Sequence, residues 1–413
     1  MVVAFPRHPC GCASLVVHPF GSNRLPSPAV TQTPGGQTQV GEQAEPARTP
    51  SIAAFRHEAC LAHDTGTGIF EAGPSPLIEV PEQHPENADL LRNLYAALDR
   101  GPLAAQVQWR EAPRAGDDEL LTVHTAEHIA AVDALASVDE VVCVTGETWA
   151  SAATPLAARH SAGAALAAAD AAAAREAPLA LAMTRPPGHH CAPGTIDGYC
   201  FYSNAALAAQ RLRDLGAARV AVVDWDVHHG NGTEACFWGR GDVLSVSVHM
   251  DHGAWGHSHR QTGLVTDRGD GAGYGANLNV PLPFGAGDRA YAAAFGEVVV
   301  PALEAFRPEA IVCAQGVDAS QFDPNGRMCV SMAGFHQIGS AVGEAARDLG
   351  IEALAVTREG GYARTYSALC HLACLLGLLG RPLELDDPLA YLPDDGDAHM
   401  PYVAAARAAL GLS

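Results

Sequence analysis

The sequence predicts an α/β protein with a three-layer, doubly wound and mainly parallel sheet that carries helices on both faces. Two observations indicate this fold class. Short apolar runs alternate along the chain with helical patterns of ten or more residues, which is typical of parallel sheets built from strand–helix–strand units. Four of these runs are followed by His, Asp or Tyr among glycines, at the strand ends where such sheets bind ligands.

The predicted elements begin at residue 88. Strands are expected where short, uninterrupted apolar runs indicate burial on both faces, at residues 179–183, 220–223, 243–248, 310–314 and 353–356. Helices are expected at residues 88–98, 124–136, 157–175, 204–215, 288–306, 334–349 and 366–379. Residues 1–50 are rich in Pro, Gly, Ser, Thr and Gln, so we expect a disordered tail there and a single domain at residues 51–413.

The composition excludes several classes of function. A formal net charge of −21 argues against nucleic acid as a direct partner and is compatible with a cationic substrate. The chain contains no lysine, which excludes a lysine Schiff base, a lysine general base and a phosphate-loop lysine.

Cysteine usage and hydropathy indicate the environment of the chain. The 11 cysteines are odd in number and include no Cys-x-x-Cys pair, so we expect a reducing, cytoplasmic environment. No apolar run reaches membrane-spanning length, and the N-terminus lacks the hydrophobic region of a signal peptide. We therefore expect no membrane partner.

The most informative segment is Asp224-Trp-Asp-Val-His228, which follows the strand at 220–223. Alternate side chains of an extended segment face the same way, so Asp224, Asp226 and His228 should converge. Carboxylates and neutral imidazole bind divalent metals, and Asp318 follows another predicted strand. Asp226, His228 and Asp318 would leave a coordination position open, as in a catalytic metal site. The alternative is a polar loop with a helix-capping Asp.

Two further clusters supply groups for proton transfer and charge stabilisation. His189 and His190 follow the strand at 179–183 in a Pro-Pro-Gly turn, and imidazole titrates near neutrality. Tyr362 follows a glycine pair that allows its hydroxyl to reach a developing oxyanion. The alternatives are a surface histidine pair and a core tyrosine after an ordinary turn.

Together these blocks resemble the histone deacetylase family, which includes acetylpolyamine amidohydrolases and shares its fold with arginases. The matching blocks are Arg185-Pro-Pro-Gly-His-His190, Asp224-x-Asp-x-His-His-Gly-Asn-Gly-Thr233, Gly316-Val-Asp-Ala-Ser-x-Phe-Asp-Pro324 and Glu359-Gly-Gly-Tyr362. They occur in family order, and the resemblance runs over residues 51–379. It implies a bacterial class II-like amidohydrolase that acts on linear amide C–N bonds. The implied reaction releases acetate and an amine from acetyl-lysine or an acetylated polyamine.

The resemblance also implies a role for each matching residue. One Zn²⁺, or alternatively Fe²⁺, would be bound by Asp226, His228 and Asp318. His190 would be the general base, and His189, oriented by Asp224, would be its electrostatic partner. Tyr362 would polarise the amide carbonyl of the substrate.

Other matching residues would shape the surroundings of the metal. Gly198 and Tyr199 would line the tunnel for the acyl chain. A structural K⁺ is implied near Asp224, Asp226, His228, Ser247 and Val248. Asn231 stands where class I members have an Asp, so it should leave His190 less basic than a carboxylate would. Bacterial relatives of the family also suggest a homo-oligomer.

Some positions depart from the family pattern. Leu90 and Leu91 occupy positions where relatives often carry basic residues, which leaves Arg92 as the candidate for an internal arginine. The segment 250–259 contains three histidines that would form a second metal site or a solvated loop. Two other functions remain open: an arginase-like ureohydrolase with two manganese ions, and a non-catalytic binding protein of the same fold.

Overall fold

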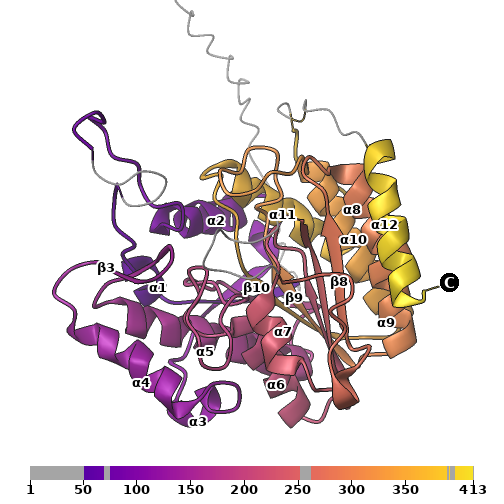
Figure 1. Ribbon diagram of the computed structural model, residues 1–413, viewed down its shortest axis with the longest axis horizontal. Helices are drawn as coiled ribbons and strands as arrows, with labels where there is room; N and C mark the ends of the chain where they lie inside the picture. Colours follow the sequence, from indigo (N-terminus) through magenta and orange to yellow (C-terminus); the bar gives the residue numbers. More distant parts are fainter. Residues whose placement is uncertain (1–50, 69–74, 252–261, 388–389, 391–395, 413) are drawn as a thin grey trace, which may run out of the picture. The chain divides into compact units, whose positions relative to one another are not determined.

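In the computed structural model the described residues are 51–68, 75–251, 262–387, 390 and 396–412 (Figure 1). They all belong to one unit, Arg48–Ser413. The predicted tail at residues 1–50 lies outside the described residues. No helix in the described ranges is both long and apolar enough to cross a membrane.

The centre of the fold is an eight-stranded sheet in which every pair of neighbouring strands is parallel, which confirms the predicted fold class. From one edge to the other, the strands are β2 (Val107–Glu111), β1 (Ile52–Arg56), β5 (Leu179–Ala182), β10 (Ala353–Arg358), β9 (Ala310–Gln315), β6 (Val220–Asp224), β7 (Val243–Met250) and β8 (Asn277–Leu282). A separate antiparallel hairpin consists of β3 (Val142–Thr145) and β4 (Thr148–Ala150).

The sheet buries both faces because successive side chains of a strand alternate between them. Ile52 and Ala54 of β1 pack into one hydrophobic core, whereas Ala53 and Phe55 pack into the other. The first core contains side chains of α2, α8, α10 and α11, and the second contains side chains of α5 and α6. Figure 1 shows these two groups of helices on opposite sides of the strands.

The helices at the predicted segments agree with the prediction to within a few residues, whereas α1, α3 and α7 were not predicted. The α-helices are α1 (Ala59–Ala62), α2 (Ala88–Arg100), α3 (Asp117–Leu120), α4 (Ala126–Ala134), α5 (Thr154–Ala173), α6 (Asn204–Asp214), α7 (Asn231–Phe237), α8 (Asp288–Ala294), α9 (Val300–Phe306), α10 (Met332–Asp348), α11 (Tyr366–Leu378) and α12 (Gly396–Leu410). Short 3₁₀ turns occur at Ala104–Gln106, Leu135–Ser137 and Gly271–Gly273.

The predicted single helix at 288–306 contains a π-helical turn, Phe295–Val299, between α8 and α9. Pro301 explains the interruption, because it has no N–H to donate and its ring crowds the preceding turn. Strands β1, β2 and β8 and the β3–β4 hairpin were not predicted. Edge strands β2 and β8 carry polar residues or proline that interrupt the apolar pattern used to find strands.

The strand order determines where the site forms. After β5 the chain passes to β6, and the gap between these two strands is filled by β10 and β9, which come much later in the sequence. The carboxyl ends of β5, β10, β9 and β6 therefore lie side by side.

Candidate active site

The four neighbouring strands deliver all the predicted catalytic and metal-binding residues to one place. His189 and His190 follow β5, Tyr362 follows β10, Asp318 follows β9, and Asp226 follows β6. Each of these side chains is buried. The alternative of a surface histidine pair is therefore wrong.

Asp226, His228 and Asp318 form a group whose potential ligand atoms all lie within 4.8 Å of one another. His228 Nδ1 lies 3.1 Å from Asp226 Oδ1 and 3.1 Å from Asp318 Oδ2. Gly360 lies so close that an added Cβ would be 2.3 Å from Asp318 Oδ2 and 2.5 Å from Asp226 Oδ2. Only glycine therefore fits beside these two carboxylates.

The electrostatics of this group fit a bound cation. Burial, and then the negative charge of Asp226, raise the pKa of Asp318 to about 7. Burial opposes charging of His228, but the hydrogen bonds and charges of Asp226 and Asp318 outweigh it and raise the pKa of His228 to about 9. Two buried carboxylates this close repel each other unless a positive charge lies between them. The donor set of two carboxylates and one imidazole suits a divalent metal.

The pKa values of His189 and His190 are shifted in opposite directions although the two residues are adjacent. Burial opposes charge on His189, but Asp226 and Asp224 outweigh it and raise the pKa of His189 well above its ordinary value. Burial, and then the positive charges of His189 and His228, hold the pKa of His190 well below its ordinary value. His189 Nδ1 lies 2.9 Å from Asp224 Oδ2. The two pKa values are thus shifted in opposite directions, as expected for an electrostatic partner and a base.

Backbone contacts fix the two loops that carry His189 and Tyr362. Glu359 Oε2 accepts hydrogen bonds from the N–H groups of Gly188 (2.7 Å) and His189 (3.2 Å). Asp323 Oδ2 accepts from the N–H groups of Tyr362 (2.6 Å) and Ala363 (3.1 Å). Sequence reasoning assigned no role to Glu359 or Asp323, although both lie in the matching blocks.

Tyr362 is in its protonated form, ready to donate a hydrogen bond. Burial, and then the charges of Asp226 and Asp318, raise the pKa of Tyr362 well above its ordinary value. Tyr362 and Tyr199 lie edge to face with ring centroids 5.8 Å apart, and Leu90 completes a small hydrophobic cluster with them. This contact of Leu90 with the two tyrosines is one that sequence reasoning missed.

Gly198 lies against His190, and Tyr199 follows it in the same loop. Both have left-handed backbone conformations, with φ of 47° and 69°. A Cβ on Gly198 would lie 2.2 Å from Cδ2 of His190, so only glycine allows the loop to pack there. The Tyr199 N–H donates to Thr148 Oγ1 (2.9 Å), and the Gly198 carbonyl accepts from the Cys200 thiol.

The residues expected around K⁺ also lie together. Asp224 pairs in register with Ser247 of β7, and Val248 is the next buried residue on that strand. Asp224 Oδ1 accepts from the Asp226 N–H (3.0 Å). Ser247 Oγ lies 2.9 Å from His249 Nδ1.

The comparisons with known proteins decide the family. A profile described as "Histone deacetylase domain" matches residues 84–378. The chain belongs to the histone deacetylase family. This deacetylase is 43% identical to Histone deacetylase 8 of Arabidopsis thaliana over 84% of the chain and 93% of that relative. It is 40% identical to the Histone deacetylase-like amidohydrolase of Pseudomonas aeruginosa, over 83% of the chain and 89% of the relative.

A solved structure of the family supports the same assignment. The crystal structure of the HDA15 HD domain matches with a TM-score of 0.74 and 31% identity, over 88% of the chain and 94% of that structure. The chain is therefore a hydrolase of the deacetylase class and does not belong to the ureohydrolases that share its fold.

Two further predictions concerned an internal arginine and a second group of histidines. The prediction of Arg92 as an internal arginine is wrong, because Arg92 is exposed and pairs with Asp89 at 2.9 Å. Arg185 and Arg358 are the buried arginines near the site, and both pair with Glu86. The histidines at 252, 257 and 259 lie outside the described residues.

A second group of potential ligands, His124, His128 and Cys191, is satisfied by hydrogen bonds instead. His124 Nε2 accepts from the Ser203 N–H (2.9 Å), so Nδ1 carries the proton and donates to a backbone carbonyl. His128 Nε2 donates to the Phe201 carbonyl (2.8 Å), so the nitrogen beside Cys191 has no free lone pair. Through these hydrogen bonds to Ser203 and Phe201, the two histidines hold the segment that follows Tyr199 in place.

We expect His124 to make the deacetylase sensitive to acid. Burial, and then His128, lower the pKa of His124 from 6.5 to about 4. Its contribution to stability is complete above pH 6.5 and is lost as the pH falls toward 4, because the unfolded state then binds more protons than the folded state. We expect the free energy of unfolding to fall by on the order of 1–3 kcal/mol from this group. Urea unfolding at pH 7 and pH 5 would measure the change.

A His124→Gln variant provides the control for this prediction. Its side chain can still accept from the Ser203 N–H but does not titrate. The variant should therefore show a smaller loss of stability between pH 7 and pH 5 than the unsubstituted protein. An equal loss in both proteins would contradict the assignment of acid sensitivity to His124.

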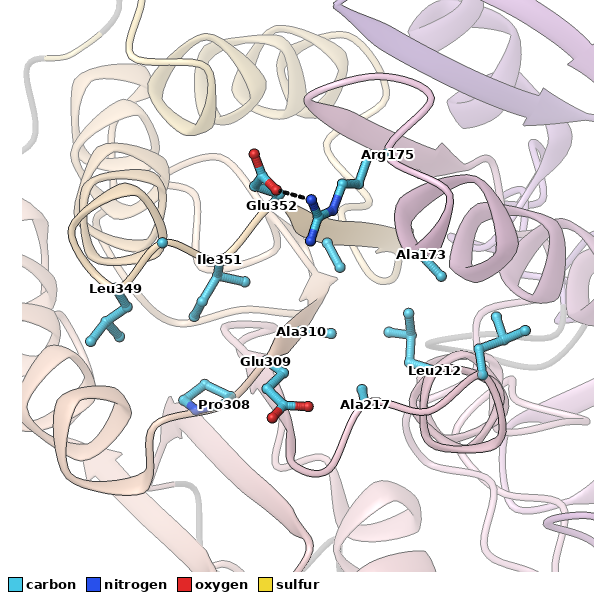
Figure 2. Close-up of a pocket in the computed structure, with 13 residues that line it drawn as sticks. Ala173, Arg175, Leu212, Ala217, Pro308, Glu309, Ala310, Leu349, Ile351 and Glu352 are labelled. Carbon is cyan, nitrogen blue, oxygen red and sulfur yellow. Dashed lines mark ion pairs between the residues drawn. The ribbon is translucent and has the colours of Figure 1, made fainter.

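A cavity of about 380 Å³ lies at the amino ends of β9 and β10, near the carboxyl ends of α5, α6 and α10 (Figure 2). Arg175 and Glu352 form an ion pair there, with Nη1 and Oε2 2.6 Å apart. None of the catalytic or metal-binding residues lines this cavity. It is therefore separate from the active site, which lies at the opposite ends of the same strands.

Proposed function

We propose that this chain is a metal-dependent deacetylase that hydrolyses an N-acetyl amide to acetate and a free amine. The observation that carries the proposal is the buried His189–His190 pair, with His189 Nδ1 2.9 Å from Asp224 Oδ2, beside the Asp226, His228 and Asp318 group. Acetyl-lysine in a protein and an acetylated polyamine are the two substrate classes that we propose.

The metal would be held by Asp226 Oδ, His228 Nδ1 and Asp318 Oδ2. We propose Zn²⁺, with Fe²⁺ as the alternative that the same donor set accepts. When bound, such an ion lowers the pKa of water and polarises a carbonyl oxygen. We also propose a structural K⁺ near Asp224, Ser247 and Val248.

The protein's own residues then move protons and stabilise charge. His190, held neutral, takes a proton from the attacking water and later delivers it to the nitrogen of the leaving amine. The amide C–N bond breaks, and the water oxygen becomes part of acetate. The Tyr362 hydroxyl donates to the substrate oxygen as that oxygen gains negative charge. His189, held positive by Asp224 and Asp226, stabilises negative charge nearby.

The test is release of free amine from an acetyl-lysine peptide and from an acetylated polyamine by the zinc-loaded protein. The chain contains no lysine, so an amine-reactive reporter meets little background from the enzyme itself. We expect turnover of one substrate class, and the ratio of kcat/KM values identifies that class. His190→Ala with its metal retained should lose at least about 100-fold in kcat. A folded, metal-loaded protein inactive on both substrates would favour a non-catalytic binding role.

A further inference from the structure

The Asn231 side chain lies between His190 and Asp197. His190 Nδ1 is 2.7 Å from Asn231 Oδ1, and Asn231 Nδ2 is 3.2 Å from Asp197 Oδ2. Asp197 belongs to a turn in which the Cys200 N–H donates to the Asp197 carbonyl at 2.7 Å. This backbone contact holds the Asp197 main chain in the loop that also carries Gly198.

The orientation of the Asn231 amide follows from this arrangement. Asn231 donates through Nδ2 to Asp197 Oδ2, so the NH₂ group of Asn231 faces Asp197. The carbonyl oxygen of Asn231 then faces His190 and can only accept. His190 must donate through Nδ1, and a neutral imidazole with its proton on Nδ1 keeps the lone pair on Nε2.

We propose that Asp197 is a positioning residue that sets the tautomer of His190 through Asn231. The inference rests on the proposed function, in which His190 takes a proton from water. Unlike a carboxylate, an amide carries one acceptor oxygen and one donor NH₂ group. Without Asp197, the Asn231 side chain can rotate by about 180° and donate from its NH₂ group to Nδ1 of His190. The imidazole proton would then move to Nε2, the atom that must accept the proton of water.

Exchanging the two side chains tests this role. Asp197→Asn replaces a carboxylate, which can only accept, by an amide, which can also donate to Asn231. The substitution should lower kcat by about 10–100-fold, with KM and metal content nearly unchanged. The double variant Asp197→Asn/Asn231→Asp restores the order of donors, because Asn at 197 donates to Asp at 231, which can only accept from His190. We expect it to recover kcat to within about threefold of the unsubstituted enzyme.

The exchange separates positioning from a structural role. If Asp197 served only to hold its turn, the double variant would be as impaired as Asp197→Asn, because both have Asn at 197. That result, or a loss confined to KM or to metal content, would overturn the proposal.

A second measurement does not depend on turnover. Nitrogen NMR of the zinc-loaded protein with ¹⁵N-labelled histidine, with His190 assigned by difference from His190→Gln, reports which ring nitrogen carries the proton. We expect the proton on Nδ1 in the unsubstituted and double variants, and a larger fraction of the Nε2 tautomer in Asp197→Asn. If the protein shows these tautomers but hydrolyses no acetylated amine, the proposed function fails and the positioning role stands. A proton on Nε2 in the unsubstituted protein overturns the positioning role.

Discussion

Asp318→Asn is expected to abolish stable metal binding and, with it, amide hydrolysis. Asp318 Oδ2 lies 3.1 Å from His228 Nδ1 in the three-residue group, and the substitution removes a negative charge that the buried cation requires. Because loss of an outer-shell partner already weakens metal binding by about 10–100-fold, loss of a ligand should exceed about 100-fold. Metal content after dialysis, measured by elemental mass spectrometry, gives the result directly.

Thermal unfolding provides an independent check on the metal. Zinc at about 1,000 times its dissociation constant should stabilise the unsubstituted protein by about 4 kcal/mol and Asp318→Asn by much less. Asp323→Asn is the matched control, since Asp323 is a buried carboxylate of the same loop that accepts backbone N–H groups. It should retain its metal. Stoichiometric zinc in dialysed Asp318→Asn would contradict the assignment.

Tyr362→Phe is expected to lower kcat by about 100–1,000-fold while KM and metal content change little. The phenol is held protonated by burial and by Asp226 and Asp318, so its hydroxyl contributes when negative charge develops on the substrate oxygen. Steady-state kinetics at saturating zinc would measure the loss. The substitution removes only the hydroxyl and leaves the ring against Tyr199 and Leu90.

Tyr291→Phe is the matched control for this experiment. Tyr291 is a fully buried phenol on α8, and the same two carboxylates contribute to raising its pKa. It has no part in the proposed chemistry, so its removal should leave kcat within about threefold. Equal losses in Tyr291→Phe and Tyr362→Phe would indicate a general electrostatic or packing effect and would contradict the specific role of Tyr362.

The chemistry of the site was predictable because it is concentrated in short segments. Asp224, Asp226 and His228 occupy one turn, and His189 and His190 are adjacent, so local spacing alone indicates that each group converges. Leu90 and Asp197 were not predictable in this way. Leu90 meets Tyr199 and Tyr362 from a different helix, and Asp197 meets Asn231 across 34 residues of sequence.

The sequence by itself determined that this chain forms a parallel α/β sheet, that polar groups follow its strands, and which chemistry those groups can perform. These features depend on side-chain periodicity and on residue type, both of which are local. Only the tertiary structure decided that β10 and β9 lie between β5 and β6, which brings the segments that carry Tyr362 and Asp318 next to those that carry His190 and Asp226. Strand order depends on how whole helices and strands pack in two cores, and no short segment of the chain encodes it.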